Sequence, residues 1–159
     1  MPGGIRQATR AETIACAAGA DTCIDYGRDD WVDAVKAATH GRGADVIYDS
    51  VGGDVLDQSL KCIAWNGRLL VIGFASGRIP EIKANRILLK NIAVVGLHWG
   101  AYAIHEPARV PEVFAALFRM YEEGVIRPVI CRRYPLERTA EALEALASRR
   151  TYGKVVITP

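Results

Sequence analysis

Residues that bind metals in proteins are scarce in this sequence and poorly spaced. There are four cysteines and three histidines, with no C-x-x-C pair and no histidine at a ligand-like spacing from a cysteine. This argues against a zinc site built from this chain alone, and we expect no metal. The cysteines lie far apart, mostly in apolar patterns, so we expect buried thiols in a reducing compartment at Cys16, Cys23, Cys62 and Cys131.

Long apolar runs and an excess of one charge are missing as well. No apolar run approaches the roughly 18 residues that a membrane-spanning helix needs, and the N-terminal stretch has no signal-peptide apolar core. Lys and Arg number 20 against 18 Asp and Glu, which leaves a formal charge of +2 spread along the chain. We therefore expect a soluble cytoplasmic protein whose partners include neither nucleic acid nor membrane.

The sequence does contain a regular alternation of apolar segments. With 159 residues, 50% of them hydrophobic, the chain is long enough for a real core. Strands are expected at residues 22–25, 45–48, 68–72, 92–95, 129–134 and 155–157, and helices at 9–18, 31–38, 54–65, 111–123 and 136–147. This alternation, with strands apolar on both faces, is typical of an α/β fold whose parallel sheet is covered by helices.

Local signals define the ends and faces of these helices. The expected N-terminal signals are a capping box at Thr9 and Glu12, a cap at Asp29 or Asp30, a cap at Asp54, and Pro111 in a first turn. The expected stops include Asn66-Gly67 and Gly124. The faces expected to pack in the core carry Leu56, Leu60 and Ile63; Val113, Phe114, Leu117, Phe118 and Tyr121; and Leu143 and Leu146.

Three strand ends bring glycines, hydroxyls and amides to one edge of the expected sheet, at residues 49–52, 73–77 and 97–100. Ligands of parallel sheets bind at the carboxyl ends of the strands. Glycines let the backbone approach a phosphate or ribose, and Ser50 or Ser76 can donate to a hydroxyl. The same glycines suit turns that need a positive φ, so nucleotide binding and ordinary turns are both open interpretations.

The sequence does not reveal a catalytic constellation. Ser50 has no nearby histidine and no G-x-S-x-G context, and Asp45 with Asp49 alternates along a strand as on a solvated surface. His98 lies at the expected edge, either as a histidine with one satisfied hydrogen bond or as a proton donor. Tyr26, at the same edge, is either a ligand contact or a packed tyrosine. Catalytic residues are therefore unassigned.

Five ordered segments are familiar as a set. They are GADTCIDYGRDDW, GRGADVIYDSVGGD, NGRLLVIGFASGRIPEI, LLKNIAVVG and YGKVVITP. In this order the chain resembles, from about Ala11 to Pro159, the C-terminal half of zinc-independent, NADPH-dependent quinone oxidoreductases. These enzymes belong to the medium-chain dehydrogenase/reductase superfamily. The resemblance implies a Rossmann-like parallel sheet with helices on both faces.

The resemblance also implies where NADPH would be contacted. Tyr26 matches a position near the adenosine ribose phosphate, residues 50–52 the adenine side, and residues 73–77 the nicotinamide ribose. Residues 97–99 match the segment beside the nicotinamide ring, and Gly153-Lys154 a late turn over the cofactor. The implied set is Tyr26, Ser50, Val51, Gly52, Gly73, Phe74, Ala75, Ser76, Gly77, Leu97, His98, Trp99, Gly153 and Lys154. In the family, hydride passes from nicotinamide to a quinone or enone in a water-poor cleft.

The sequence departs from the family pattern at its start, where the catalytic domain, the first two Rossmann strands and the glycine-rich turn are expected but not found. Residues 1–125 are then an incomplete nucleotide-binding domain, and residues 126–159 a strand-helix-strand segment that returns to the catalytic domain. The family's basic residue for the 2′-phosphate falls near Ala11, beside Arg10, so NADPH and NADH are both open. We expect weak or absent NADPH binding by this chain alone, and homo-oligomerisation or strand rearrangement at its open edges.

The leading interpretation is a partial quinone oxidoreductase that is inactive by itself. An enoyl reductase acting on an acyl thioester is its nearest rival, because the same cofactor half serves both reactions. Two further interpretations stay open. One is a non-catalytic binding or assembly module that uses its exposed strand edges, and the second is a reading frame that starts late.

Overall fold

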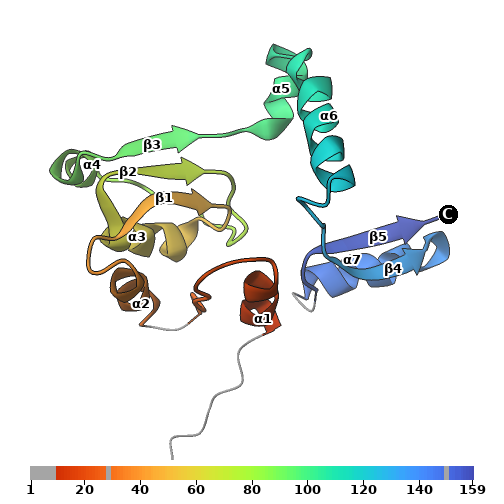
Figure 1. The fold of residues 1–159 in the computed structure, drawn as a ribbon, viewed down its shortest axis with the longest axis horizontal. Coiled ribbons are helices and arrows are strands. Elements are labelled where there is room, and N and C mark those ends of the chain that lie inside the picture. The colour runs from red at the N-terminus through yellow and green to blue at the C-terminus, as the bar shows by residue number, and fades with distance from the viewer. Residues whose placement is uncertain (1–9, 28–29, 149–150) are drawn as a thin grey trace, which may run out of the picture. The chain divides into compact units, whose positions relative to one another are not determined.

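The computed structural model describes residues 10–27, 30–148 and 151–159. Contacts divide the chain into two units, one up to Trp99 and one from Gly100 to Pro159. Each unit contains its own parallel sheet and helices (Figure 1). This arrangement confirms the expected Rossmann-like α/β class. The domain division expected after residue 125 stays a prediction.

The first unit is built on three parallel strands in the order β1-β2-β3. They are β1 (Ala44–Asp49), β2 (Ile63–Val71) and β3 (Ala93–Gly96). Ile47 of β1 lies opposite Leu69 of β2, which in turn lies opposite Val94 of β3. Because the strands run in the same direction, their carboxyl ends meet at one edge, which is where the sequence places its glycines and hydroxyls.

Helix α3 (Gly53–Cys62) supplies the main core contact of this sheet. Its Leu56 and Leu60 are four residues apart and buried, and they pack with Leu69 of β2. Ile63 and Ile92, at the starts of β2 and β3, complete this cluster. The expected apolar face of this helix is therefore confirmed as core.

Both ends of α3 differ from the prediction. Gly52, not Asp54, is the N-cap residue, and the helix ends at Cys62 rather than at Asn66-Gly67. Pairing shifts from Ala44↔Ile63 to Val46↔Arg68, so the β2 segment that includes Asn66 bulges out of the ladder. Asn66 has φ 59°, a left-handed conformation that makes such a bulge possible.

Residues 22–25 do not form the expected strand. In the described part of the chain, β1 is the outer strand of its sheet and pairs with β2 alone. A short apolar segment forms a strand only if an adjacent strand accepts and donates its backbone hydrogen bonds. Here Ile24 instead packs against Trp31 and Val32 of α2 (Trp31–Ala38). The outer position also leaves Val46 and Tyr48 of β1 exposed, although the sequence suggested a strand buried on both faces.

Two of the four cysteines are not thiols. Cys16 and Cys23 form a disulfide that joins the end of α1 (Arg10–Ala17) to the segment after it. The chain reverses at Gly19, so the two Cα atoms come within 6.0 Å despite a separation of seven residues. The prediction of four thiols is therefore wrong at Cys16 and Cys23. Cys62 is a buried thiol and Cys131 a partly buried one. The capping residue expected at Thr9 lies outside the described residues.

The second unit contains β4 (Ile130–Pro135) and β5 (Lys154–Thr158), which pair in parallel, and α7 (Thr139–Ala147). Helix α7 buries Ala142 and Ala145. Leu143 and Leu146, expected to point inward, are 62% and 56% exposed. The two alanines allow a close approach of the helix to the strands, and each leucine, one position after an alanine, lies beside this contact and remains exposed.

The remaining helices are α4 (Ala84–Lys90) in the first unit and α5 (Tyr102–His105) and α6 (Arg109–Glu122) in the second. All residues of α6 are described, and none of them is buried. Phe118, the most exposed residue of its apolar stripe, is 63% exposed. The expectation that this stripe packs in the core is therefore wrong, because α6 packs mainly against the short α5 within its unit.

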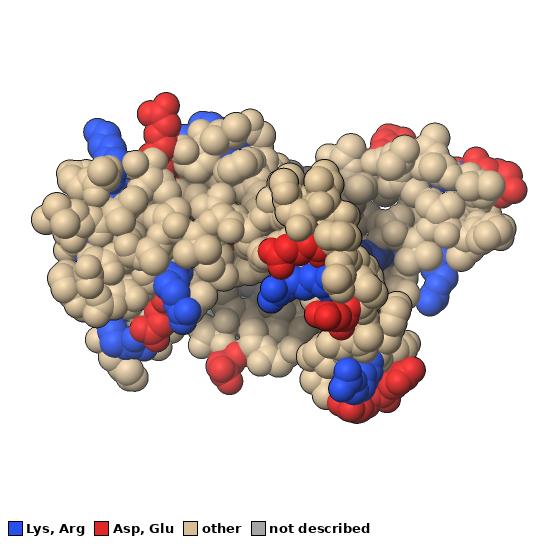
Figure 2. Space-filling view, turned by 90° about the horizontal axis from the view of Figure 1, so that it is seen from above, with Lys and Arg blue, Asp and Glu red and all other residues tan. Residues whose placement is uncertain are grey.

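The surface carries charges of both signs. On the face shown in Figure 2, basic and acidic side chains are interspersed rather than gathered by sign. Among the described residues, no helix has both the length and the apolar character needed to cross a membrane.

Candidate functional site

The carboxyl end of β1 is a tight turn closed by a buried carboxylate. Asp49 is only 4% exposed, and its Oδ1 accepts hydrogen bonds from the amides of Val51 at 2.8 Å and Gly52 at 3.0 Å. Gly52 has φ 68°, and a Cβ there would lie 2.9 Å from Cδ1 of Phe74. Asp49 therefore shapes the turn and is not the surface solubility residue that the alternation suggested.

The loop after β2 packs onto this turn through backbone hydrogen bonds. The amide of Ala75 donates to the carbonyl of Ser50 at 3.1 Å, and the amide of Ser76 to that of Val51 at 2.9 Å. In the opposite direction, the amide of Gly53 donates to the carbonyl of Arg78 at 3.1 Å. The ends of β1 and β2 thus form one cross-linked structure, as the shared sheet edge predicted.

An open hollow of about 590 Å³ lies beside this structure, where β2 and β3 end. Phe74, Leu97 and His98 line it together with backbone from both strand ends. The complete lining is Val71, Ile72, Gly73, Phe74, Gly96, Leu97 and His98. Its volume lies in the range of small-molecule sites, and its walls are mostly apolar with one imidazole.

The structure brings together most of the residues predicted for the cofactor. Ser50, Val51 and Gly52 contact the loop 73–77, which meets Leu97 and His98 at the hollow. Trp99, 41% exposed, follows at the end of the same unit. The structural role of Asp49 was missed in the sequence. An Asp two or three residues before a glycine is typical of an Asx-turn, in which the Asp side chain accepts hydrogen bonds from the amides that follow it.

Tyr26 does not line the hollow, and Gly153 and Lys154 belong to the second unit. Tyr26 is 57% exposed in a turn where the amide of Gly27 donates to Oδ1 of Asp25 at 2.8 Å. In the second unit, the Lys154 amide donates to the Val129 carbonyl at 2.8 Å. Their role in cofactor binding stays a prediction.

The carboxyl edge fits a nucleotide in part. The hollow offers an apolar wall for a ring, and the exposed Ser50 offers a hydroxyl for a ribose, whereas the Ser76 hydroxyl already donates to the Arg78 carbonyl at 3.4 Å. The amides of residues 51–53, however, already donate to Asp49 and to the Arg78 carbonyl. A pyrophosphate group needs amides that point outward, so this turn does not serve as its cradle.

A zinc ion does not fit the described residues. They contain no group of three or more His, Cys, Asp or Glu side chains arranged to hold a metal. Cys16 and Cys23 are joined to each other, and Cys62 is buried beside Trp31 and Val32. Zinc ligation requires three or four convergent donors, which the described part of the chain does not bring together.

Comparison with known proteins agrees with this geometry. The family model for zinc-binding dehydrogenases matches residues 18–157. A quinone oxidoreductase-like protein 2 homolog of Nematostella vectensis is 45% identical over 140 residues, covering 87% of this chain and 38% of that protein. A 2-haloacrylate reductase of a Burkholderia species is 30% identical over 166 residues, covering 99% of this chain and 47% of that protein.

Solved structures show the same relationship. The structure of Escherichia coli quinone oxidoreductase complexed with NADPH superposes with a TM-score of 0.82 at 30% identity, covering 93% of this chain and 46% of that one. The chain thus spans less than half the length of these relatives. The fold and the hollow at the carboxyl edge agree with these matches. The chain therefore belongs to the zinc-binding dehydrogenase family of oxidoreductases, and it corresponds to the C-terminal part of the quinone oxidoreductases in that family.

Proposed function

We propose that this chain supplies the cofactor-binding part of an NADPH-dependent oxidoreductase that reduces a quinone or an α,β-unsaturated carbonyl compound. The observation that carries the proposal is the apolar hollow at the carboxyl ends of β2 and β3, lined by Phe74, Leu97 and His98. When bound, NADPH supplies the hydride. The names of two relatives, a quinone oxidoreductase and a haloacrylate reductase, support an electron-poor double bond as acceptor.

The residues of the hollow have distinct roles in this proposal. Phe74 and Leu97 exclude water from one face of the nicotinamide, which protects a hydride from protons of the solvent. Beside the hollow, Ser50 donates to a ribose hydroxyl and so fixes the orientation of the ring. His98 donates a hydrogen bond to the carboxamide or to the acceptor oxygen. No residue is assigned as catalytic.

The chain alone should bind NADPH weakly. Its Val51 and Gly52 amides are held by Asp49, so the pyrophosphate finds no amide cradle at this turn. Each charged phosphate that lacks hydrogen bonds in the site loses solvation without compensation. We therefore expect a dissociation constant above about 0.1 mM, and no turnover of quinone by this chain.

A titration of NADPH fluorescence, with NADH in parallel, tests the proposal. Gly96 lines the hollow, and nothing lies within 4 Å of a Cβ placed there, so G96L fills the hollow without a backbone clash. The matched control is A93L, an exposed residue of the same strand that does not line the hollow. We expect G96L to abolish binding and A93L to preserve it. Equal binding by both variants, or no binding by the unaltered chain at millimolar cofactor, would refute the proposed site.

We also propose homo-oligomerisation through the sheet edges of the first unit. β3 is an outer strand of the described sheet, and its Val95 is 43% exposed. Outer strands present unpaired backbone groups that readily pair with a second copy. Size-exclusion chromatography should show a concentration-dependent larger species, which V95K, by placing a charge on this exposed outer strand, should weaken. A monomer at all concentrations would contradict this.

The haloacrylate reductase relative favours one alternative within the same reaction class. An activated alkene joined to a carboxyl derivative, including an acyl thioester, would be the acceptor instead of a quinone. Turnover assays on a protein that contains this chain together with a catalytic domain separate the two, because only one substrate class should be reduced with high efficiency.

A further inference from the structure

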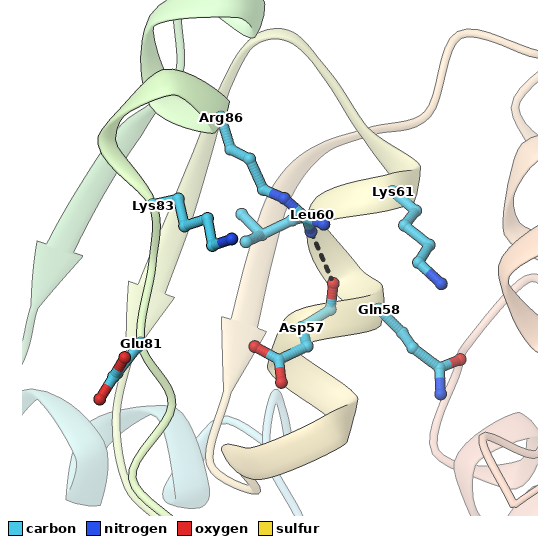
Figure 3. Close-up of a pocket in the computed structure, with 7 residues that line it drawn as sticks. All are labelled: Asp57, Gln58, Leu60, Lys61, Glu81, Lys83 and Arg86. Atoms are coloured by element: carbon cyan, nitrogen blue, oxygen red, sulfur yellow. Dashed lines mark hydrogen bonds between the residues drawn. The ribbon is translucent and has the colours of Figure 1, made fainter.

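A second hollow, of about 360 Å³, lies between α3 and the start of α4 (Figure 3). Three cationic side chains line it: Lys61 from α3, Lys83 from the preceding loop, and Arg86 from α4. It shares no lining residue with the hollow at the carboxyl edge. The proposed oxidoreductase function does not use it.

Two of the cations converge over an apolar surface. In Figure 3, the side chains of Lys83 and Arg86 reach toward α3, and their ends lie close to Leu60. Arg86 is held there because its Nη1 donates to the backbone carbonyl of Asp57 at 3.5 Å. Leu60 is 5% exposed and forms part of the core, so this floor is rigid.

The two carboxylates that line the hollow, Asp57 and Glu81, form no ion pair with these three cations. The carboxylate of Asp57 is bound by Arg78, which also pairs with Asp54 at 2.8 Å. The hydrogen bond to Asp57, joined by that to Asp54, raises the pKa of the Arg78 guanidinium and keeps it charged. Glu81 points away from Lys83 and Arg86 in Figure 3.

Lys61 and Lys83 have no ion-pair partner among the residues that the structure describes. Lys83 and Arg86 therefore act together on the space between them, and Lys61, whose end extends away from them in Figure 3, adds charge at longer range. The fork of a guanidinium beside the point charge of an ammonium is the usual protein combination for a phosphate group. Gln58 also lines the hollow, and its amide points to the same side of α3 as Lys61, away from Lys83 and Arg86.

We propose that this hollow binds a small phosphate-bearing anion through Lys83 and Arg86, with Lys61 adding long-range attraction. The volume is at the lower end of small-molecule sites, which suits a phosphate monoester of a small metabolite better than a dinucleotide. Since Arg86 bridges α4 to α3 and α4 leads directly into β3, occupancy also stabilises the first unit.

Isothermal titration of the unaltered chain at low salt tests the site, with inorganic phosphate in one arm and AMP in the other. We expect saturable binding of both, and tighter binding of AMP identifies a phosphate monoester as the preferred source. K83Q should weaken binding about fivefold or more, and K61Q less, because Lys61 acts only at longer range. Both lysine side chains are exposed, so neither substitution should affect the fold.

The matched control is K36Q, which removes the same charge from α2, outside the hollow. An equal loss in K36Q and K83Q would show mere attraction to net charge and overturn the proposal, as would linear, unsaturable heats at tens of millimolar ligand. Abolition of phosphate binding by G96L would place the anion in the carboxyl-edge hollow and would also refute this site. Failure of NADPH to bind leaves these outcomes unchanged, so the two proposals are tested separately.

Discussion

The carboxylate of Asp49 accepts a hydrogen bond from the amide of Gly52, three residues later, through both of its oxygens, at 3.0 and 3.2 Å. The same carboxylate accepts the amide of Val51 at 2.8 Å. This arrangement fixes the turn on which the loop 73–78 packs, and it is the physical basis of the first prediction.

Replacement of Asp49 by Leu should destabilise the first unit by about 2–4 kcal/mol, because the buried Gly52 amide and the partly buried Val51 amide lose their acceptor. D49N, which keeps one carbonyl oxygen, should cost less than half as much. Urea unfolding followed by circular dichroism measures both. D45A, on the same strand, removes only an exposed ion pair with Arg42, so it is the control and should unfold close to the unaltered midpoint. Equal midpoints for D49L and D45A would contradict the assigned role.

Lys90 closes the C-terminal end of α3. Its Nζ donates to the carbonyls of Leu60 at 3.1 Å, Lys61 at 3.3 Å and Ile63 at 3.0 Å. K90M should lower the free energy of unfolding by about 1–2 kcal/mol, since these carbonyls lose a charged donor at a helix C-terminus. K61M, which removes an exposed ammonium from the same helix end, should change little. If thermal unfolding shows K61M to be as harmful as K90M, the capping role is wrong.

Two glycines with positive φ should respond differently to alanine. Gly77 has φ 83° and open space where a Cβ would lie, so G77A should cost about 1 kcal/mol of backbone strain. Gly52, with φ 68°, adds a clash with Phe74 at 2.9 Å, and G52A should cost about 2–4 kcal/mol. Chemical denaturation of the pair measures the difference. A double variant, G52A with F74A, should recover part of the loss through relief of the clash.

Stability should fall at alkaline pH because of Cys62. Burial raises the pKa of its thiol above the ordinary value, with partial opposition from the charge of Lys90. The folded state then holds the proton more tightly than the unfolded state. The stabilisation from the protonated Cys62 thiol is complete below the pKa of the thiol in the unfolded chain. It is lost as the pH rises through the pKa of the thiol in the folded chain.

Urea midpoints compared near neutral pH and near pH 9.5, at the upper side of an unfolded thiol's titration, measure this effect. C62A should remove most of the alkaline loss, whereas C131A, at the other free thiol, should retain it. A pH profile that C62A leaves unchanged would assign the loss to other groups.

The strands of the first sheet and the face of α3 were predictable because their signals are local. Leu56 and Leu60 follow the helical period, and an apolar run such as residues 68–72 between turn residues reads as a strand. The parallel direction followed from the alternation of strands and helices. Ser50, Gly73 and Leu97 were expected at one edge of the sheet because they follow the carboxyl ends of parallel strands.

Other features depend on contacts that a local pattern does not encode. Residues 22–25 have strand-like composition but find no neighbour to pair with among the described residues. The Cys16–Cys23 disulfide depends on the reversal of the chain at Gly19. In α7, either Ala145 or its neighbour Leu146 could have faced the strands, and the sequence pattern alone does not distinguish them. In the structure Ala145 is the buried one.

The cross-linked turn and loop at the carboxyl edge have a consequence for affinity. The backbone bonds from Ala75 to Ser50, from Ser76 to Val51 and from Gly53 to Arg78 are formed in the free chain. A ligand that enters the neighbouring hollow therefore meets walls that already have their final shape. The conformational entropy of this loop is already lost when the chain folds. Ligand binding therefore does not have to order the loop, and the free energy of the ligand's contacts contributes more fully to its affinity.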